Sequence, residues 1–293
     1  IIANLNKTKL TITDVVFTIA PRINAAGRMK HGLHAVELLK ETDLEKAQEF
    51  AASIENYNSD RRELDTSITQ EALEQIIAHQ EEDKFTSVVY DPGWHKGVIG
   101  IVASRLIENY YRPTLVFCKS GDQLAASARS VRGFDVYNAL EQCADYIEQF
   151  GGHMYAAGLT LLPENYEKFK ARFEEVVCAT IQNKHLTPEI QIDAVLPLEQ
   201  ITPKFYRILQ QMAPFGPGNS TPVFMTENVV DSGYGKCVGK KEDHLKIKVA
   251  SKKGDKNGFN AIGFNLGNKA EQITDGKKFH IAYSIDENEW QGN

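Results

Sequence analysis

Residues 20–29 (APRINAAGRM) gather two arginines and an asparagine around a glycine, a set of side chains that could bind phosphate. A guanidinium group presents its N–H donors as a planar fork that matches two phosphate oxygens. Arg22, Asn24 and Arg28 are therefore candidate phosphate ligands. The same composition also fits a helix-breaking connector with arginines on its surface, and this stretch alone does not separate the two interpretations.

Residues 91–100 (DPGWHKGVIG) place His95, Lys96 and a glycine immediately before a predicted helix. Free backbone N–H groups and the positive end of the helix dipole attract anions at such a position. His95 and Lys96 are therefore candidate anion ligands. Many loops between a strand and a helix have this composition for turn geometry alone.

Residues 126–130 (ASARS) follow the two-residue period of a β-strand. This period directs Ser127 and Arg129 to one face and the two alanines to the other. The alanines allow tight packing beneath, and a hydroxyl beside a bidentate cation suits a phosphate. A structural salt bridge would explain Arg129 equally well.

Residues 151–158 (GGHMYAAG) bring two glycines and further small residues around a single histidine. Small residues leave room for another backbone or for a ligand, and His153 would stand in that space. A lone histidine is more often a structural residue, but the density of small residues favours a functional one here.

The elements that must position these side chains begin with a long helix predicted over residues 43–80. Its apolar residues recur at a spacing of three to four, and Asp43 is a plausible N-cap. The length and the polar outer face indicate a strut between domains.

Residues 84–183 alternate strands and helices, which predicts a small α/β domain. Strands are predicted over 86–91, 114–118, 123–130 and 156–162, and helices over 98–110, 135–150 and 166–181. The first strand, helix and strand form a βαβ unit with a parallel pair and a right-handed crossover. Gly151 is predicted to end the second helix.

Beyond residue 187 the pattern changes to short strands with Gly and Asn turns, which predicts a small OB-like barrel. The expected strands are 190–196, 222–230, 244–250, 258–266 and 278–285, with one helix over 203–212.

The composition is that of a soluble globular protein of two or three domains, with 42% hydrophobic and 25% charged residues among 293. It excludes a disordered chain and a disulfide-stapled miniprotein, and no apolar run approaches the roughly 18 residues of a membrane span. Four separated cysteines without a CxxC pair argue against a zinc site and for a reducing cytosol.

The net charge of −6 hides a segregation of charge along the chain. Residues 41–83 contain 13 acidic and 3 basic residues, whereas residues 236–256 contain eight lysines and three acidic residues. Because salt screens charges beyond about 8–10 Å, a ligand responds to the local patch. The lysine-rich segment therefore suits an anionic ligand, and equally a solvated surface.

In this order, the motifs resemble the bacterial RecJ family of single-strand-specific exonucleases, within the DHH phosphoesterase superfamily. The resemblance runs through 20–29, Asn58 with Arg61 and Arg62, 91–105, 126–130, 151–158 and 213–219 (APFGPGN). The family's Asp-His-His triplet occurs nowhere in the chain. The chain also opens at Ile1, so we expect a C-terminal fragment without the metal-binding domain.

The resemblance implies an overall α/β fold in three parts. These are a helical connector over residues 1–83, a DHH-associated α/β domain over 84–186, and an all-β OB-fold domain over 187–293. The whole enzyme would be a hydrolase that removes nucleotides from the 5′ end of single-stranded DNA in cytoplasmic DNA repair and recombination. Mn²⁺ or Mg²⁺ would be bound by the missing domain, with no metal in this fragment, which alone would be inactive.

The resemblance also implies residue roles. Ser127, Arg129 and Ser130 would hold the terminal phosphate, while Gly151, Gly152 and the catalytic His153 would face the metals and the scissile phosphate. Other residues would line the path of the strand or grip it on the barrel: Arg22, Asn24, Arg28, His95, Lys96, Lys240, Lys241, Lys246 and Lys248. Expected partners are single-stranded DNA, a single-stranded-DNA-binding protein and a helicase, and no membrane.

Two alternatives remain open at the level of sequence. One is a DHH-type phosphodiesterase acting on short oligonucleotides or cyclic dinucleotides, for which residues 187–293 would have no purpose. The other is a non-catalytic nucleic-acid-binding module like the end of alanyl-tRNA synthetases, which the motifs at 126–130 and 214–219 disfavour.

Overall fold

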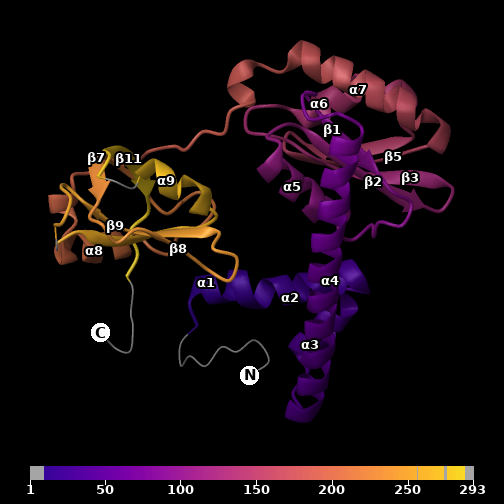
Figure 1. The fold of residues 1–293 in the computed structure, drawn as a ribbon. Coiled ribbons are helices and arrows are strands. Elements are labelled where there is room, and N and C mark those ends of the chain that lie inside the picture. Colours follow the sequence, from indigo (N-terminus) through magenta and orange to yellow (C-terminus); the bar gives the residue numbers. More distant parts are fainter. Residues whose placement is uncertain (1–9, 256, 274–275, 288–293) are drawn as a thin grey trace. The chain divides into compact units, whose positions relative to one another are not determined.

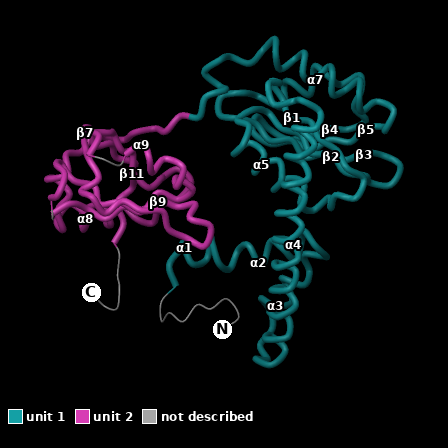
Figure 2. Tube along the Cα trace, viewed as in Figure 1, with its two compact units in different colours: residues 1–188 teal, residues 189–293 magenta. Residues whose placement is uncertain are grey.

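The computed structural model describes residues 10–255, 257–273 and 276–287. The chain forms two compact units, residues 1–188 and 189–293 (Figure 2). No helix among the described residues is long and apolar enough to cross a membrane.

The first unit begins with a series of helices, the last of which is long (Figure 1). They are α1 (Ile12–Asp14), a π-helical turn (Val15–Ile19), α2 (Ala20–Met29), α3 (Leu33–Lys40) and α4 (Leu44–Ala78). Asp43 caps α4 by accepting hydrogen bonds from the backbone N–H groups of Glu45 and Lys46, which confirms both the helix and its predicted start. Residues 20–29 form a helix, so the helix-breaking connector interpretation is wrong.

A five-stranded sheet of order β1-β2-β3-β5-β4 follows. Its strands are β1 (Ser87–Tyr90), β2 (Thr114–Ser120), β3 (Gln123–Arg129), β4 (Gln149–His153) and β5 (Ala156–Leu161). Only the β1–β2 pair is parallel, joined by α5 (Ile99–Asn109), as the predicted βαβ unit requires.

Helices cover both faces of this sheet (Figure 1). Helices α4 and α5 pack on the face that receives Val116 and Cys118 of β2, whereas Leu115 and Phe117 pack against α6 (Val136–Glu141) and α7 (Tyr166–Thr180). The strand therefore buries both faces, which explains its continuous apolar sequence.

The helix predicted over 135–150 is wrong. Helix α6 ends at Glu141, a 3₁₀ turn covers Ala144–Tyr146, and β4 begins at Gln149. Antiparallel pairing of β4 with β5 satisfies the backbone and packs Phe150 on the core, which outweighs the local helical period. Gly151 is therefore a strand residue rather than a helix stop. Further 3₁₀ turns span Pro163–Asn165 and Asn183–His185.

The second unit is built on a sheet of order β10-β9-β7-β11, with β6 paired to β7 and β8 paired to β9. Its strands are β6 (Ala194–Val195), β7 (Phe224–Asp231), β8 (Lys236–Val238), β9 (His244–Ala250), β10 (Phe259–Gly263) and β11 (Phe279–Tyr283). Its helices are α8 (Pro203–Gln210), α9 (Ala270–Ile273) and 3₁₀ turns at Leu198–Gln200 and Gly267–Lys269. The all-β character is confirmed, but the first strand is much shorter than predicted and β8 was not predicted.

Candidate phosphate site and nucleic-acid face

The predicted pairing of a serine and an arginine on one face of β3 is confirmed. The Arg129 guanidinium donates from Nη1 to Ser127 Oγ at 2.9 Å and to the Ala128 carbonyl oxygen at 2.8 Å. Ala126 and Ala128 point the other way into the core. Both polar side chains are half-buried, so they are fixed in place while still reachable from solvent.

The first turn of α5 lies directly against this pair. A Cβ atom on Gly100 would lie 2.8 Å from Arg129 Nη2 and 2.9 Å from Ser127 Oγ, so a larger residue there would displace these side chains. The start of an 11-residue helix thus adjoins a guanidinium and a hydroxyl. Helix dipole and side chains favour an anion at the same place.

Arg28 reaches the same region from the end of α2. It donates from Nη1 to the Gly97 carbonyl oxygen at 3.3 Å, and a Cβ on Gly97 would lie 2.1 Å from the carbonyl oxygen of Arg28. Burial, and after it the positive charge of Arg28, lower the pKa of Arg129. Two cations that repel each other here would both be stabilised by an anion between them.

The Gly-Gly-His motif lies at the end of β4, on the same sheet face as Arg129. Across β3, β5 and β4, Arg129 pairs with Ala156 and Ala156 with His153. Residues in register point to the same side, and strands lie about 4.7–4.9 Å apart, so Arg129 and His153 flank a floor roughly 10 Å wide. Ala156 and the paired glycines Gly151 and Gly158 project little or no side chain from this face, so the surface between Arg129 and His153 is open.

His153 is exposed, and its Nδ1 accepts a hydrogen bond from the Tyr155 backbone N–H at 3.2 Å. In the neutral ring the proton is therefore on Nε2, which leaves an N–H donor for a ligand. Within β4 the position of Gly152 requires glycine, because its φ is +153° and a Cβ there would lie 2.3 Å from the Ala156 carbonyl oxygen.

Most of the other predicted site residues of the first unit contact groups of their own unit. Arg22 binds Glu55 of α4 and donates to the Thr18 carbonyl oxygen at 2.7 Å, so it helps to hold α2 on α4. Ser130 Oγ donates to the Phe134 carbonyl oxygen at 2.8 Å. The remaining three are placed as follows: Lys96 Nζ lies 3.2 Å from Ser120 Oγ, His95 Nδ1 accepts from the Gly97 N–H at 3.1 Å, and Asn24 is exposed.

A second arginine cluster adjoins the site, and sequence reasoning assigned it no role. Arg61 of α4 and Arg105 of α5 both bind the buried carboxylate of Asp65. The available signal was the position of Asn58, Arg61 and Asp65 at helical spacing within the apolar stripe of α4.

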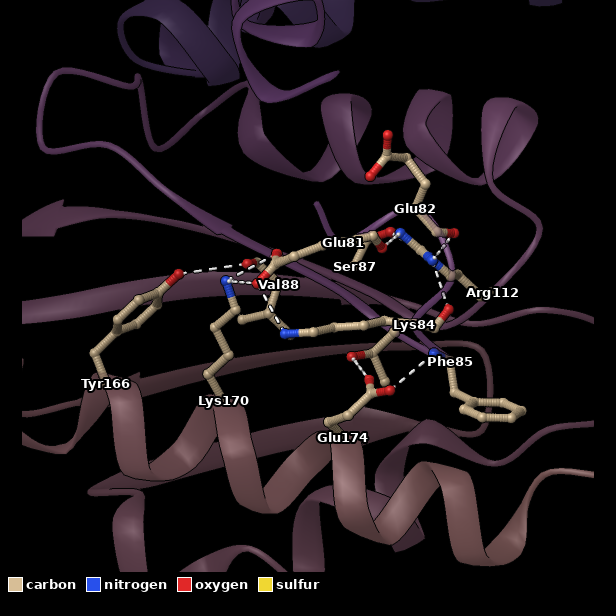
Figure 3. Close-up of polar contacts among 11 residues, drawn as sticks. Glu81, Glu82, Lys84, Phe85, Ser87, Val88, Arg112, Tyr166, Lys170 and Glu174 are labelled. Carbon is tan, nitrogen blue, oxygen red and sulfur yellow. Dashed lines mark hydrogen bonds and ion pairs between the residues drawn. The ribbon is translucent and has the colours of Figure 1, made fainter. Parts of the chain in front are cut away.

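A cavity of about 580 Å³ lies beside β1, at the opposite edge of the sheet from β4. Lys84 and Lys170 both lie within 3.0 Å of Glu81 there, so both ammonium groups are already engaged in ion pairs (Figure 3). None of the predicted site residues lines this cavity. The candidate phosphate site therefore lies away from this cavity, in the region of β3 and β4.

In the second unit, β8, β9 and β10 share a basic face. Lys246 of β9 pairs with Lys236 on one side and Ile262 on the other, and Lys248 pairs with Asn260. The intervening residues Leu245, Ile247 and Val249 are in the core, so the lysine positions face outward.

Aromatic rings stand at two corners of this face. The Tyr234 ring is 63% exposed and lies 5.8 Å from Lys248 Nζ, and the Phe264 ring is 67% exposed and packs edge-on against His244. Lysines between exposed rings suit a single strand, whose bases stack while its phosphates bind cations. Of the four predicted lysines, Lys246 and Lys248 belong to this face, whereas Lys240 and Lys241 lie in the turn between β8 and β9.

Among the described residues, no group of three or more His, Cys, Asp or Glu is arranged to hold a metal ion.

Comparison with protein families assigns the two units. The DHHA1 domain matches residues 82–179 and the RecJ OB domain matches residues 192–293. The chain thus contains a DHHA1 domain followed by a RecJ OB domain, and both predicted domain types are confirmed.

Two curated relatives and one crystal structure show more specifically which proteins this chain resembles. The single-stranded-DNA-specific exonuclease RecJ of Bacillus subtilis (strain 168) is 34% identical over 94% of this chain and 35% of its own length. RecJ of Haemophilus influenzae (strain Rd) is 31% identical over 100% of this chain and 52% of its own length. The crystal structure of RecJ from Thermus thermophilus with Mn²⁺ matches with a TM-score of 0.80 and 27% identity, over 96% of this chain and 40% of that one.

The chain belongs to the RecJ family and corresponds to the C-terminal half of its members, as the motifs indicated. It spans between 35% and 52% of the length of these two curated relatives.

Proposed function

We propose that this chain is the substrate-binding part of a RecJ-type 5′-to-3′ single-stranded-DNA exonuclease. Its α/β domain would hold the 5′ phosphate and the first nucleotides, and its OB domain would bind the strand further along. The observation that carries this proposal is the convergence of Arg28, Ser127, Arg129 and the start of α5 on one sheet face, with His153 across the floor.

Each group has a distinct part in this function. Arg129 and Arg28 would neutralise the phosphate, Ser127 would donate its hydroxyl hydrogen, and the Nε2–H of His153 would bind an oxygen of the scissile phosphate. Fixed donors of this kind stabilise charge without reorganising during the reaction. Contacts to backbone rather than to base edges suit an enzyme that is indifferent to sequence.

Hydrolysis itself requires more than these residues. Structures of relatives contain Mn²⁺ or Mg²⁺. We propose that the N-terminal part of the family's proteins would hold one of these metals, which would supply the activation of water in the whole enzyme. We also propose that the enzyme acts in the cytoplasm during repair and recombination, with a helicase and a single-stranded-DNA-binding protein as partners.

Arg129→Ala should weaken binding of 5′-phosphorylated oligonucleotides roughly 10- to 150-fold, because one charge-assisted contact contributes about 1.5–3 kcal/mol. Binding of the same oligonucleotide with a 5′ hydroxyl should change little. Fluorescence anisotropy with both oligonucleotides measures the difference. Arg172→Ala removes an exposed cation from α7 and is the matched control. Equal weakening at both ends would exclude a terminal-phosphate role for Arg129.

Replacing Lys246 and Lys248 together by alanine should reduce the slope of log K against log salt by roughly one to two units, because two phosphate contacts are lost. Titrations of a long single strand at several salt concentrations give the slope. The Lys240/Lys241 double variant removes the same charge from the neighbouring turn. A loss confined to that control would put the strand at the turn rather than on the β8–β9–β10 face.

A further inference from the structure

A buried carboxylate joins two helices behind the phosphate site. Asp65 of α4 is 0% exposed, and its Oδ2 lies 3.2 Å from Arg61 Nη1 and 2.8 Å from Arg105 Nη2. Its Oδ1 forms a second ion pair with Arg105 Nε. Arg105 therefore donates a hydrogen bond to Oδ2 and forms an ion pair with Oδ1, so two of its nitrogens lie against one carboxylate.

Arg61 is held from its own helix as well. Its Nη2 donates to Asn58 Oδ1 at 2.9 Å, one turn earlier on α4, and Asn58 is fully buried. Arg105 comes from α5, 40 residues away in sequence. Asp65 is thus the joint through which charge-assisted bonds connect α4 to α5.

Both helices lead to the phosphate site. Helix α5 begins beside Ser127 and Arg129, as the contacts of Gly100 show. Helix α4 holds α2 through the packing of Ala26 on Ile54 and through the Arg22–Glu55 ion pair. Arg28 lies in the last turn of α2. The distance between Arg28 and Arg129 therefore depends on how α4 sits on α5.

Repulsion between positive charges opposes the close approach of Arg28 and Arg129. Burial lowers the pKa of Arg61; Asp65 opposes this shift, and the charges of Arg62, Arg105 and Arg28 add to it. Arg28 also lowers the pKa of Arg129 after burial. The like charges of these arginines repel one another across the α2–α4–α5 junction, and the Asp65 carboxylate lies between two of them, Arg61 and Arg105.

We propose that Asp65 is a positioning residue of the phosphate site: by binding Arg61 and Arg105 it fixes α4 and α2 against α5, and so keeps Arg28 within reach of a phosphate bound by Ser127 and Arg129. The inference rests on the proposed capture of a 5′ phosphate. It assigns Asp65 no contact with the substrate.

Asp65→Asn tests this because general electrostatics and positioning predict different results. Removing a negative charge should tighten binding of every oligonucleotide equally. Loss of the joint should instead reduce the affinity ratio between 5′-phosphorylated and 5′-hydroxyl oligonucleotides by roughly tenfold, without weakening the 5′-hydroxyl complex. Glu63→Gln makes the same charge change at an exposed position of α4 and should leave the ratio unchanged.

If circular dichroism shows that Asp65→Asn does not fold, a second variant tests the positioning role. The Arg105 side chain is 44% exposed, so Arg105→Gln breaks the joint from its accessible side. It should lower the ratio in the same way, and Arg105→Lys should restore part of it. A ratio that stays at the wild-type value in folded Asp65→Asn or Arg105→Gln overturns the positioning role and leaves the phosphate site standing. A wild-type chain without preference for a 5′ phosphate overturns both.

Discussion

Gly152→Ala is expected to destabilise the first unit by about 2–6 kcal/mol and to abolish the preference for a 5′ phosphate. The backbone at Gly152 has a φ of +153°, and the new Cβ would lie 2.3 Å from the Ala156 carbonyl oxygen and 2.5 Å from the Ala157 Cα. Both neighbours are backbone atoms of β5, so no side chain can move aside. Strained backbone costs about 1–3 kcal/mol, and a forced shift of packed atoms costs a further 1–3 kcal/mol.

Denaturant unfolding measures this loss, and Gly151→Ala is its control. A Cβ at Gly151 would meet no atom within 4 Å, and its φ is not in the left-handed region. Gly151→Ala should therefore unfold within about 1 kcal/mol of the wild type. Equal midpoints for the two variants would show that the backbone around Gly152 relaxes easily and does not fix the position of His153.

Arg112→Met should lower the free energy of unfolding by about 3–5 kcal/mol, although it keeps an unbranched side chain in place. Arg112 is 4% exposed and donates to Ser87 Oγ at 2.8 Å and to the carbonyl oxygens of Glu81, Glu82 and Lys84 (Figure 3). Each buried acceptor left without a donor costs about 1–3 kcal/mol. These carbonyl groups form the turn between α4 and β1, so that junction should loosen first.

Hydrogen exchange of the backbone amides near residues 81–87, together with denaturant midpoints, measures the effect of Arg112→Met. Arg172→Met changes an exposed arginine of α7 that pairs with Glu175, and should stay within about 0.5 kcal/mol of the wild type. A similar small change at Arg112 would mean that water replaces its guanidinium in the turn.

The features that were correctly predicted depend on neighbours in the chain. Helix α4 follows from its 3–4 spacing and the cap at Asp43, and the shared face of Ser127 and Arg129 follows from the two-residue period of a strand. The motifs also indicated the family, because their order is a property of the sequence. Local geometry suffices for such features.

Where pairing partners are distant, the local pattern gave the wrong element. Residues 147–150 continue a helical period but leave it for β4, because β5 supplies backbone partners and a surface for Phe150. The short strand β8 was missed because three residues give no period, and its existence depends on pairing with β9.

The sequence by itself therefore determined the family, the order of the domains and which residue types could bind phosphate. Only the tertiary structure decided that Arg22 is occupied by Glu55 while Arg28 adjoins Arg129, and that Asp65 joins two helices through Arg61 and Arg105. It also put His153 in register with Arg129 through Ala156. Contacts of this kind depend on packing between elements, which the spacing of residues along one chain does not specify.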